Sequence, residues 1–146
     1  MIRWIFVFIV LIVGWIGYNY YYNELDSKTN FRGLPITIEY RKGDTKSGTG
    51  VFGNNWKKTM LHDYGYFDGI MGADGKELDF YMNPDAISDK IFRVKQLNVL
   101  TKEFDEYKIM IGFMTMEHAK QGYLTYYPED WAGYGGVEEI TLEEIK

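Results

Sequence analysis

The stretch Tyr64-Gly-Tyr-Phe-Asp-Gly-Ile-Met-Gly-Ala-Asp-Gly-Lys-Glu-Leu-Asp79 decides the fold, because it joins two strand-like runs through a glycine-rich turn. Residues 64–67 predict a short strand, residues 69–75 predict a turn, and residues 78–82 predict the next strand. Three carboxylates, Asp74, Glu77 and Asp79, therefore lie in a turn that runs into a strand. Carboxylates that converge in this way suit hard cations such as Mg²⁺ or Mn²⁺.

The elements on either side predict a small α+β domain. Residues 34–40 alternate in the period-2 manner of a strand, and residues 56–61, 90–97 and 106–113 also predict strands. Residues 41–50 carry three glycines and predict an exposed loop or hairpin tip. Residues 115–127 predict a helix capped by Thr115 and terminated by Pro128, and residues 137–146 predict a strand and an acidic helical turn. We expect an antiparallel β-barrel or a curled sheet with a C-terminal helix packed on it.

The first 22 residues predict a transmembrane anchor. Residues 4–17 are all apolar or glycine, and the tyrosines that follow extend the segment to the length that a bilayer needs. A secretion signal is the alternative, but Tyr and Asn stand where a small-residue cleavage site is expected. We expect a single-pass anchor at residues 1–22, a linker at 23–32 and a domain at 33–146. Arg3 weakly favours a domain outside the cytoplasm, and the side of the membrane stays open.

Composition excludes several classes of function. The 146 residues suit one domain, and a net charge of −5 argues against nucleic acid as the main partner. The chain has no cysteine, so disulfides and thiolate metal sites are excluded. Any metal must therefore be held mainly by oxygen ligands.

The candidate chemistry is metal-assisted phosphoryl hydrolysis. Glu39 ends a predicted strand, and Lys42 and Lys46 follow it in the sequence. Carboxylates that hold divalent metals, beside lysines that neutralise phosphate oxygens, are the components of this reaction. Scattered acidic residues and Asp-Gly turns are also ordinary surface features, so a purely structural role stays open.

The same residues resemble the soluble (family I) inorganic pyrophosphatases. That family has a Tyr-Gly-Tyr/Phe-Ile segment followed by Asp-Gly-Asp-x-x-Asp, and here Tyr64-Gly-Tyr-Phe is followed by Asp74-Gly-Lys-Glu-Leu-Asp79. The sequence is most similar to a shortened pyrophosphatase-like domain of phage and mobile-element proteins, through residues 33–43, 89–92, 104–108 and 123–133. The resemblance spans residues 33 to about 140, and it implies a pyrophosphatase/OB-like fold.

The resemblance also implies roles for individual residues. It implies that Lys46 approaches a phosphate, that Tyr64 donates to one, and that Asp79 is a catalytic metal ligand. The carboxylates that it implies around Mg²⁺, or around Mn²⁺, are Glu39, Asp74, Asp79 and Asp89. Lys108 would be a distal phosphate lysine, with a surface or sheet-edge lysine as the alternative.

One departure from the family pattern leaves two hypotheses. Lys76 stands where the central Asp is expected, and a protonated lysine cannot bind Mg²⁺. Glu77 follows it, but successive side chains of a strand point to opposite faces. The first hypothesis is a membrane-anchored, Mg²⁺-dependent hydrolase of diphosphate or a related phosphoanhydride. The second is a catalytically degenerate module with a binding or structural role in phage or mobile-element biology.

Overall fold

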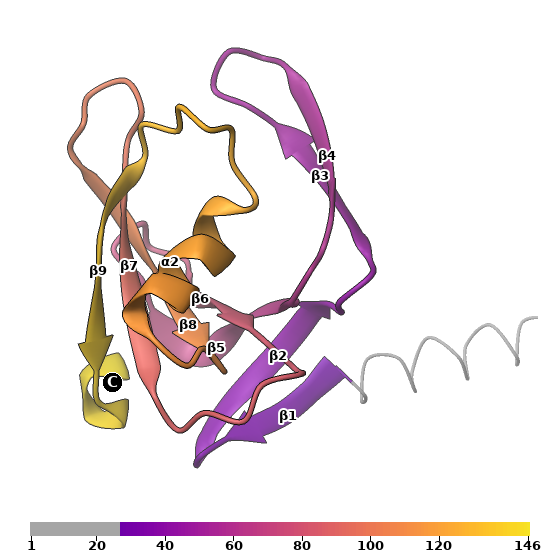
Figure 1. The fold of residues 1–146 in the computed structure, drawn as a ribbon, viewed down its shortest axis with the longest axis vertical. Coiled ribbons are helices and arrows are strands. Elements are labelled where there is room, and N and C mark those ends of the chain that lie inside the picture. Colours follow the sequence, from indigo (N-terminus) through magenta and orange to yellow (C-terminus); the bar gives the residue numbers. More distant parts are fainter. Residues whose placement is uncertain (1–26) are drawn as a thin grey trace, which may run out of the picture.

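The structure is a computed structural model that describes residues 27–146, and most of these residues lie in β-strands (Figure 1). In chain order the elements are β1 (Lys28–Phe31), β2 (Leu34–Tyr40), β3 (Thr45–Thr49), β4 (Asn55–Thr59), β5 (Asp63–Met71), β6 (Glu77–Met82), β7 (Ile91–Leu97), β8 (Phe104–Ile111), α2 (Met116–Leu124), β9 (Tyr134–Ile140) and the 3₁₀ helix η1 (Leu142–Ile145). The predicted anchor at residues 1–22 lies outside this range. Within residues 27–146, no helix combines the length and apolarity needed to cross a membrane.

Seven strands form one sheet, in the order β1-β2-β5-β6-β8-β7-β9. All neighbours are antiparallel except β6 and β8, which run parallel because β7 lies on the far side of β8. The sheet is strongly twisted, so that β1 and β2 cross the direction of β7 and β9 steeply (Figure 1). The curled sheet with a C-terminal helix is confirmed. The alternative expectation of a barrel is wrong, because β1 and β9 remain separate edges.

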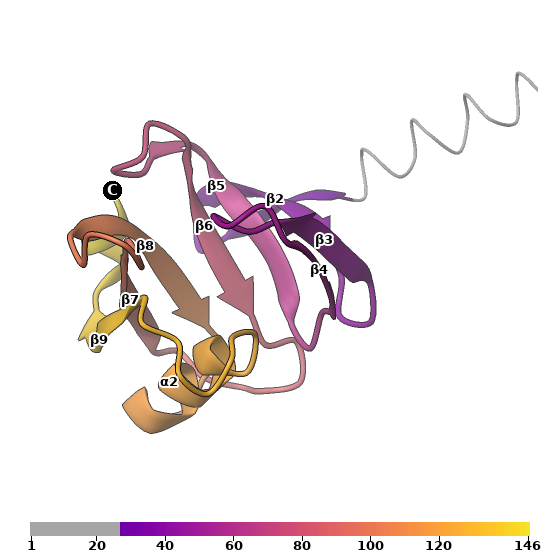
Figure 2. The ribbon, with the colours of Figure 1, turned by 90° about the horizontal axis from the view of Figure 1, so that it is seen from above.

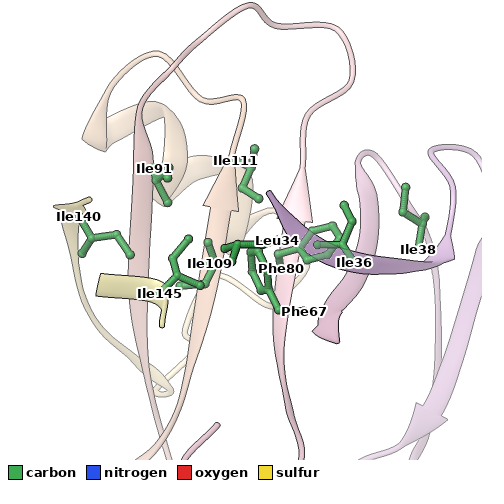
Figure 3. Close-up of a cluster of buried hydrophobic side chains, with 10 residues drawn as sticks. All are labelled: Leu34, Ile36, Ile38, Phe67, Phe80, Ile91, Ile109, Ile111, Ile140 and Ile145. Atoms are coloured by element: carbon green, nitrogen blue, oxygen red, sulfur yellow. The ribbon is translucent and has the colours of Figure 1, made fainter. Parts of the chain in front are cut away.

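The first face of the sheet carries an aliphatic cluster. Its side chains come from alternate positions of the strands, as the period-2 geometry requires, and Figure 3 shows them extending from β9 to β2. The cluster consists of Leu34, Ile36, Ile38, Phe67, Phe80, Ile91, Ile109, Ile111, Ile140 and Ile145. Strands β2 and β5 approach closely at Gly65, where a Cβ would lie 2.0 Å from the Thr37 carbonyl oxygen.

Helix α2 covers one end of the second face. Thr115 caps the helix as predicted, because its side chain accepts a hydrogen bond from the backbone N–H of His118. The helix ends at Leu124, three residues earlier than expected, where Tyr126 and Tyr127 donate to carbonyls three positions back and tighten the last turn. Two of its residues pack into an aromatic-rich cluster of Met60, Tyr64, Tyr81, Phe92, Val94, Met110, Phe113, Ala119, Tyr123 and Tyr126.

The structure differs from the predicted elements in three places. Residues 45–49 form β3 rather than a loop, and β3 pairs with β4 in a separate hairpin that stands off the sheet in Figure 1 and overlaps β2 in the view from above (Figure 2). Strand β5 runs on to Met71, because the turn is closed at Gly72, whose N–H donates to the Lys76 carbonyl. Strand β1 falls in the expected linker, since the tight turn at Gly33 brings it back onto β2.

Candidate active site

Most of the predicted site residues meet at the end of the second face that α2 leaves uncovered. Tyr81 of β6 and Met110 of β8 lie in the buried aromatic cluster. Two residues earlier on the same strands, and therefore on the same face, stand Asp79 and Lys108. Tyr64 of β5 pairs with Tyr81 and reaches the same place. Strand periodicity thus delivers polar side chains to a face that is otherwise apolar.

Lys108 is the centre of this group and is only 6 % exposed. Its Nζ lies 2.5 Å from Oδ2 of Asp79 and 3.1 Å from Oε1 of Glu106, and it donates to the Tyr64 hydroxyl at 3.1 Å. Burial alone would lower the pKa of Lys108, but Tyr64 and the two carboxylates around it hold that pKa well above its ordinary value. The side chain is therefore a fixed ammonium on a central strand, and the surface or sheet-edge alternative is wrong.

Tyr64 is a protonated donor in the middle of the group. Its hydroxyl donates to Oδ2 of Asp79 at 2.6 Å. Burial raises the pKa of the Tyr64 phenol far above its ordinary value, and the Asp79 charge adds to the shift against the opposing effect of Lys108. The phenol thus stays protonated at neutral pH, and its one proton is directed at Asp79.

Lys46 reaches the group from β3. Its Nζ lies 3.4 Å from the centroid of the Tyr64 ring and 5.5 Å from that of Tyr40. Burial and the charge of Lys108 lower the pKa of Lys46 to about 8, against the opposing pull of Asp79 and Glu39. The β3–β4 hairpin therefore supplies a second cation whose charge responds to pH near neutrality.

The carboxylates are gathered at a cost in free energy. Glu39 lies where the β2–β5 register shifts, and partial burial followed by the charge of Asp79 raises the pKa of its carboxyl. Burial also raises the pKa of Glu106, although Lys108 opposes the shift. Oε2 of Glu77 is buried with no hydrogen-bond partner in the part of the chain that the structure covers. Glu39 and Glu77 thus add negative charge on the Asp79 side of the group, which favours the binding of a further cation there.

Asp74 and Lys76 belong to the β5–β6 turn. Oδ1 of Asp74 accepts a hydrogen bond from the backbone N–H of Lys76 at 3.0 Å, and Asp74 is close enough to raise the pKa of Glu106 slightly. The Lys76 side chain is exposed, and between residues 27 and 146 it has no ion-pair partner. Asp79 is thus paired with Lys108 and not with Lys76.

The structure brings together Glu39, Lys46, Tyr64 and Asp79, with Asp74 at their margin, but it places Asp89 elsewhere. Asp89 is exposed in the loop before β7, and its backbone carbonyl accepts a hydrogen bond from Arg32. The register sets Lys108 opposite Val94, five residues further along the chain. Asp89 precedes Ile91, the first residue of β7, so it lies beyond the end of that strand and away from Lys108.

Sequence reasoning missed Glu106, and it named Glu77 without placing it on the same face as Asp79. Both follow the period of the strand: Glu106 precedes Lys108 by two residues, and Glu77 precedes Asp79 by two. That spacing could have found them once Asp79 and Lys108 were chosen. It was not decisive in the sequence, because the pairing of β6 with β8 joins segments about 30 residues apart.

The residues suit a hard cation in type and in charge. The available donors are carboxylate oxygens, and one of them, on Glu77, has no partner. Across residues 27–146, however, no three carboxylate or imidazole groups converge closely enough to form a preformed metal site. In this arrangement Lys108 holds the place between Asp79 and Glu106.

Comparison with known proteins identifies the family. No curated protein and no solved structure gives a significant match to the chain. The sequence model of the family described as Inorganic Pyrophosphatase matches residues 18–146, which is most of the chain. With strands and a helix that fit a pyrophosphatase/OB-like fold, the chain belongs to the inorganic pyrophosphatase family.

Proposed function

We propose that this protein hydrolyses diphosphate, or a related phosphoanhydride, with Mg²⁺ as cofactor. The observation that carries the proposal is the group formed by Lys46, Lys108, Tyr64 and Asp79 at the open end of the sheet. Two ammonium groups and a phenol can donate to phosphate oxygens, Lys108 and Tyr64 in exchange for their present partners, and the carboxylates beside them offer ligands to a divalent cation. Membership of the inorganic pyrophosphatase family supports the same reaction.

In the proposed mechanism each group has a distinct role. Lys46 and Lys108 bind phosphate oxygens and neutralise the charge that develops on the departing phosphate, and Tyr64 donates a hydrogen bond to it. The carboxylates that would hold the metal are Asp79, Glu39, Asp74 and Glu106. Bound Mg²⁺ supplies a Lewis acid and lowers the pKa of a water molecule. Lys108 is shared between the two sets, because its present partners are Asp79 and Glu106.

Lys76 does not close the site in this proposal. Its side chain is exposed, so Asp79 pairs with Lys108 instead. Glu77 and Glu106 supply carboxylates near the place of the missing central Asp. Its positive charge nevertheless competes with a metal for Asp74, in the same turn. We therefore expect Lys76 to lower the affinity for Mg²⁺ rather than to abolish hydrolysis.

The test is phosphate release from diphosphate by the full chain in mild detergent, with and without Mg²⁺. Release that depends on Mg²⁺ and falls at least about 100-fold in Asp79→Asn supports the proposal; such a loss corresponds to about 2.7 kcal/mol. Asp105→Asn is the matched control, because Asp105 is exposed on the opposite face of β8. Lys76→Asp should lower the Mg²⁺ concentration needed for half-maximal activity.

The opposite result would favour the second hypothesis. If the folded protein releases no phosphate, and Lys76→Asp does not restore release, then the chain is a degenerate pyrophosphatase fold with a binding or structural role. A phage or mobile-element setting for that role is supported only by the resemblance of the sequence to such domains.

We also propose that residues 1–22 anchor the domain to a membrane. The support is their apolar sequence with aromatic residues at both ends. Flotation with vesicles that is lost on deletion of residues 1–22 would support the proposal, and flotation of the shortened chain would contradict it. Protease protection in intact cells would then show on which side the domain lies.

A further inference from the structure

The cavity beside Lys108 is larger than a diphosphate ion requires. Its volume is about 840 Å³, within the range of about 300–1,000 Å³ that is usual for pockets enclosing drug-sized ligands. One end is formed by Lys46, Tyr64 and Lys108. The other end is aromatic, with Trp56, Tyr126, Tyr127 and Trp131 in its walls. A diphosphate ion is small and wholly polar, so it would use only the first end.

One aromatic wall belongs to the loop that follows α2, and it is held rigidly. The Trp131 indole stacks on the Tyr127 ring, with centroids 4.3 Å apart and planes 13° apart, and its N–H donates to the Tyr123 hydroxyl at 3.3 Å. A Cβ at Gly133 would lie 2.3 Å from the indole, so only glycine lets the backbone pass so close. A ring that is already ordered costs little further entropy when a ligand stacks on it.

The opposite wall is the β3–β4 hairpin, which faces the loop after α2 in Figure 1. The Trp56 ring lies across the hairpin at Gly48, where a Cβ would be 2.4 Å from it. At the hairpin tip, Val51 and Phe52 line the cavity, although Phe52 is 79 % exposed. Strands β3 and β4 pair with each other and with no strand of the main sheet. The hairpin thus presents apolar rings towards the cavity and bears little of the core.

Lys58 connects the two walls. Its Nζ lies 4.6 Å from the centroid of the Trp56 ring and 4.7 Å from that of Tyr127, and it donates to the Tyr126 carbonyl at 2.9 Å. Four lysines line the cavity against two carboxylates, in a chain whose net charge is −5. The cavity therefore combines an excess of positive charge with flat aromatic surface, and a ligand that suits both is an anion that carries an aromatic ring.

We propose that the preferred ligand is an organic diphosphate whose other end is a flat aromatic ring, as in a nucleoside diphosphate. Its phosphates bind at Lys46 and Lys108, and its ring lies between Trp131 and the hairpin residues Trp56 and Phe52. This inference rests on the proposed phosphate-binding role of the two lysines. Flat rings gain more from stacking on aromatic walls than saturated chains do, which is why a ring is expected there rather than an alkyl group.

Hydrolysis of such a ligand is chemically the same reaction as hydrolysis of diphosphate. Water adds its oxygen to the terminal phosphorus, the bond from that phosphorus to the bridging oxygen breaks, and one proton goes to solvent. The products are a nucleoside monophosphate and orthophosphate, so no oxidant, reductant or further reactant is needed.

The experiment measures binding apart from hydrolysis. Two probes that cannot be hydrolysed at the bridge, adenosine 5′-(α,β-methylene)diphosphate and methylenediphosphonate, are titrated calorimetrically into the full chain with Mg²⁺. The ring-bearing probe should bind at least about tenfold more tightly. That ratio should fall towards one in Trp131→Leu and in Phe52→Ser, the latter being a change at an exposed tip that the fold tolerates. Phe104→Leu removes an aromatic residue outside the cavity and should leave the ratio unchanged.

Equal affinities of the two probes for the unaltered protein would overturn the inference. Tighter binding of geranyl diphosphate than of the nucleotide analogue would also overturn it, in favour of an alkyl ligand. The outcome is separable from that of the proposed function. If the protein hydrolyses diphosphate but does not prefer the ring-bearing probe, only the proposed ring site is refuted. If it prefers that probe but hydrolyses nothing, only the proposed hydrolase activity is refuted.

Discussion

The two ends of the second sheet face use the same strands for opposite purposes. At the end that α2 covers, Tyr81 and Met110 pack with Phe92 in a buried cluster. Asp79 and Lys108 lie two residues earlier on β6 and β8, on the same face of the sheet, at the end that α2 does not cover. Apolar burial at the first end stabilises the fold, whereas the second end holds partly buried charges of both signs.

The difference shows how a small domain places a charged site on a sheet. The covered end provides a rigid base, so the polar groups beyond it inherit their positions from strand geometry. The carboxyl pKa values of Glu39 and Glu106 are both raised, so this arrangement disfavours the ionised form of these two groups. If one end is structural and the other functional, substitutions at the covered end should mainly lower stability, and substitutions at the charged end should change binding and catalysis.

Phe92→Ala should give the largest loss of stability. Phe92 is 1 % exposed in the cluster beneath α2, and removal of a buried aromatic ring costs about 3–5 kcal/mol. Urea unfolding followed by circular dichroism measures the change. Met114→Ala, at an exposed position before the helix, is the control and should stay within about 0.5 kcal/mol. A loss below about 1 kcal/mol for Phe92→Ala would show that the covered end is not the structural base.

Lys108→Met should destabilise the protein by about 3 kcal/mol, because it leaves Asp79 and Glu106 without their shared cation. The expected value is at the lower end of the usual range, since the Asp79 side chain keeps 23 % of its exposure to water. The double variant Lys108→Met/Asp79→Asn should recover part of the loss. Equal losses in the single and double variants would mean that packing around Lys108, and not its charge, stabilises the fold.

The charge of Lys46 should govern how substrate binding depends on pH. Its pKa is about 8, so the ammonium that attracts phosphate is present below that pH and is lost above it. The KM for diphosphate should rise by up to about tenfold for each pH unit above 8. Lys46→Arg keeps its charge, so its pH profile of KM should be flatter than that of the unaltered protein. Comparing the two profiles also cancels the titration of the substrate itself. Parallel profiles would remove Lys46 from the binding site.

Glu39→Gln should give the smallest change, and in the stabilising direction. The pKa of Glu39 is raised in the folded protein, so its ionised form favours unfolding, and its contribution to stability falls as pH rises through that pKa. A neutral side chain should therefore raise Tm at pH 7 by about 1 °C while lowering Mg²⁺-dependent phosphate release. Calorimetry and the phosphate assay together test this, and a lower Tm would mean that Glu39 is a structural residue.

Much of the fold could be predicted because apolar alternation marks most of the strands. Strand β2 was predicted with its exact bounds, and α2 with its cap at Thr115, since both carry strong local patterns. Strand β3 could not be predicted in this way. Its sequence, Thr-Lys-Ser-Gly-Thr, has no apolar alternation, because neither of its faces enters the core, and only pairing with β4 defines it.

The sequence by itself determined the strand pattern, the family resemblance, and the residues Glu39, Lys46, Tyr64 and Asp79 that meet at one end of the sheet. Only the tertiary structure decided which cation pairs with Asp79. Lys76 lies nearer in the chain, but its turn leaves it exposed, whereas the parallel pairing of β6 with β8 buries Lys108 beside Asp79 and Glu106. The antiparallel pairing of β7 with β8 places Asp89 beyond the end of β7 that lies away from the site. The physical reason is that strand register acts between segments distant in the chain, and a local pattern does not encode it.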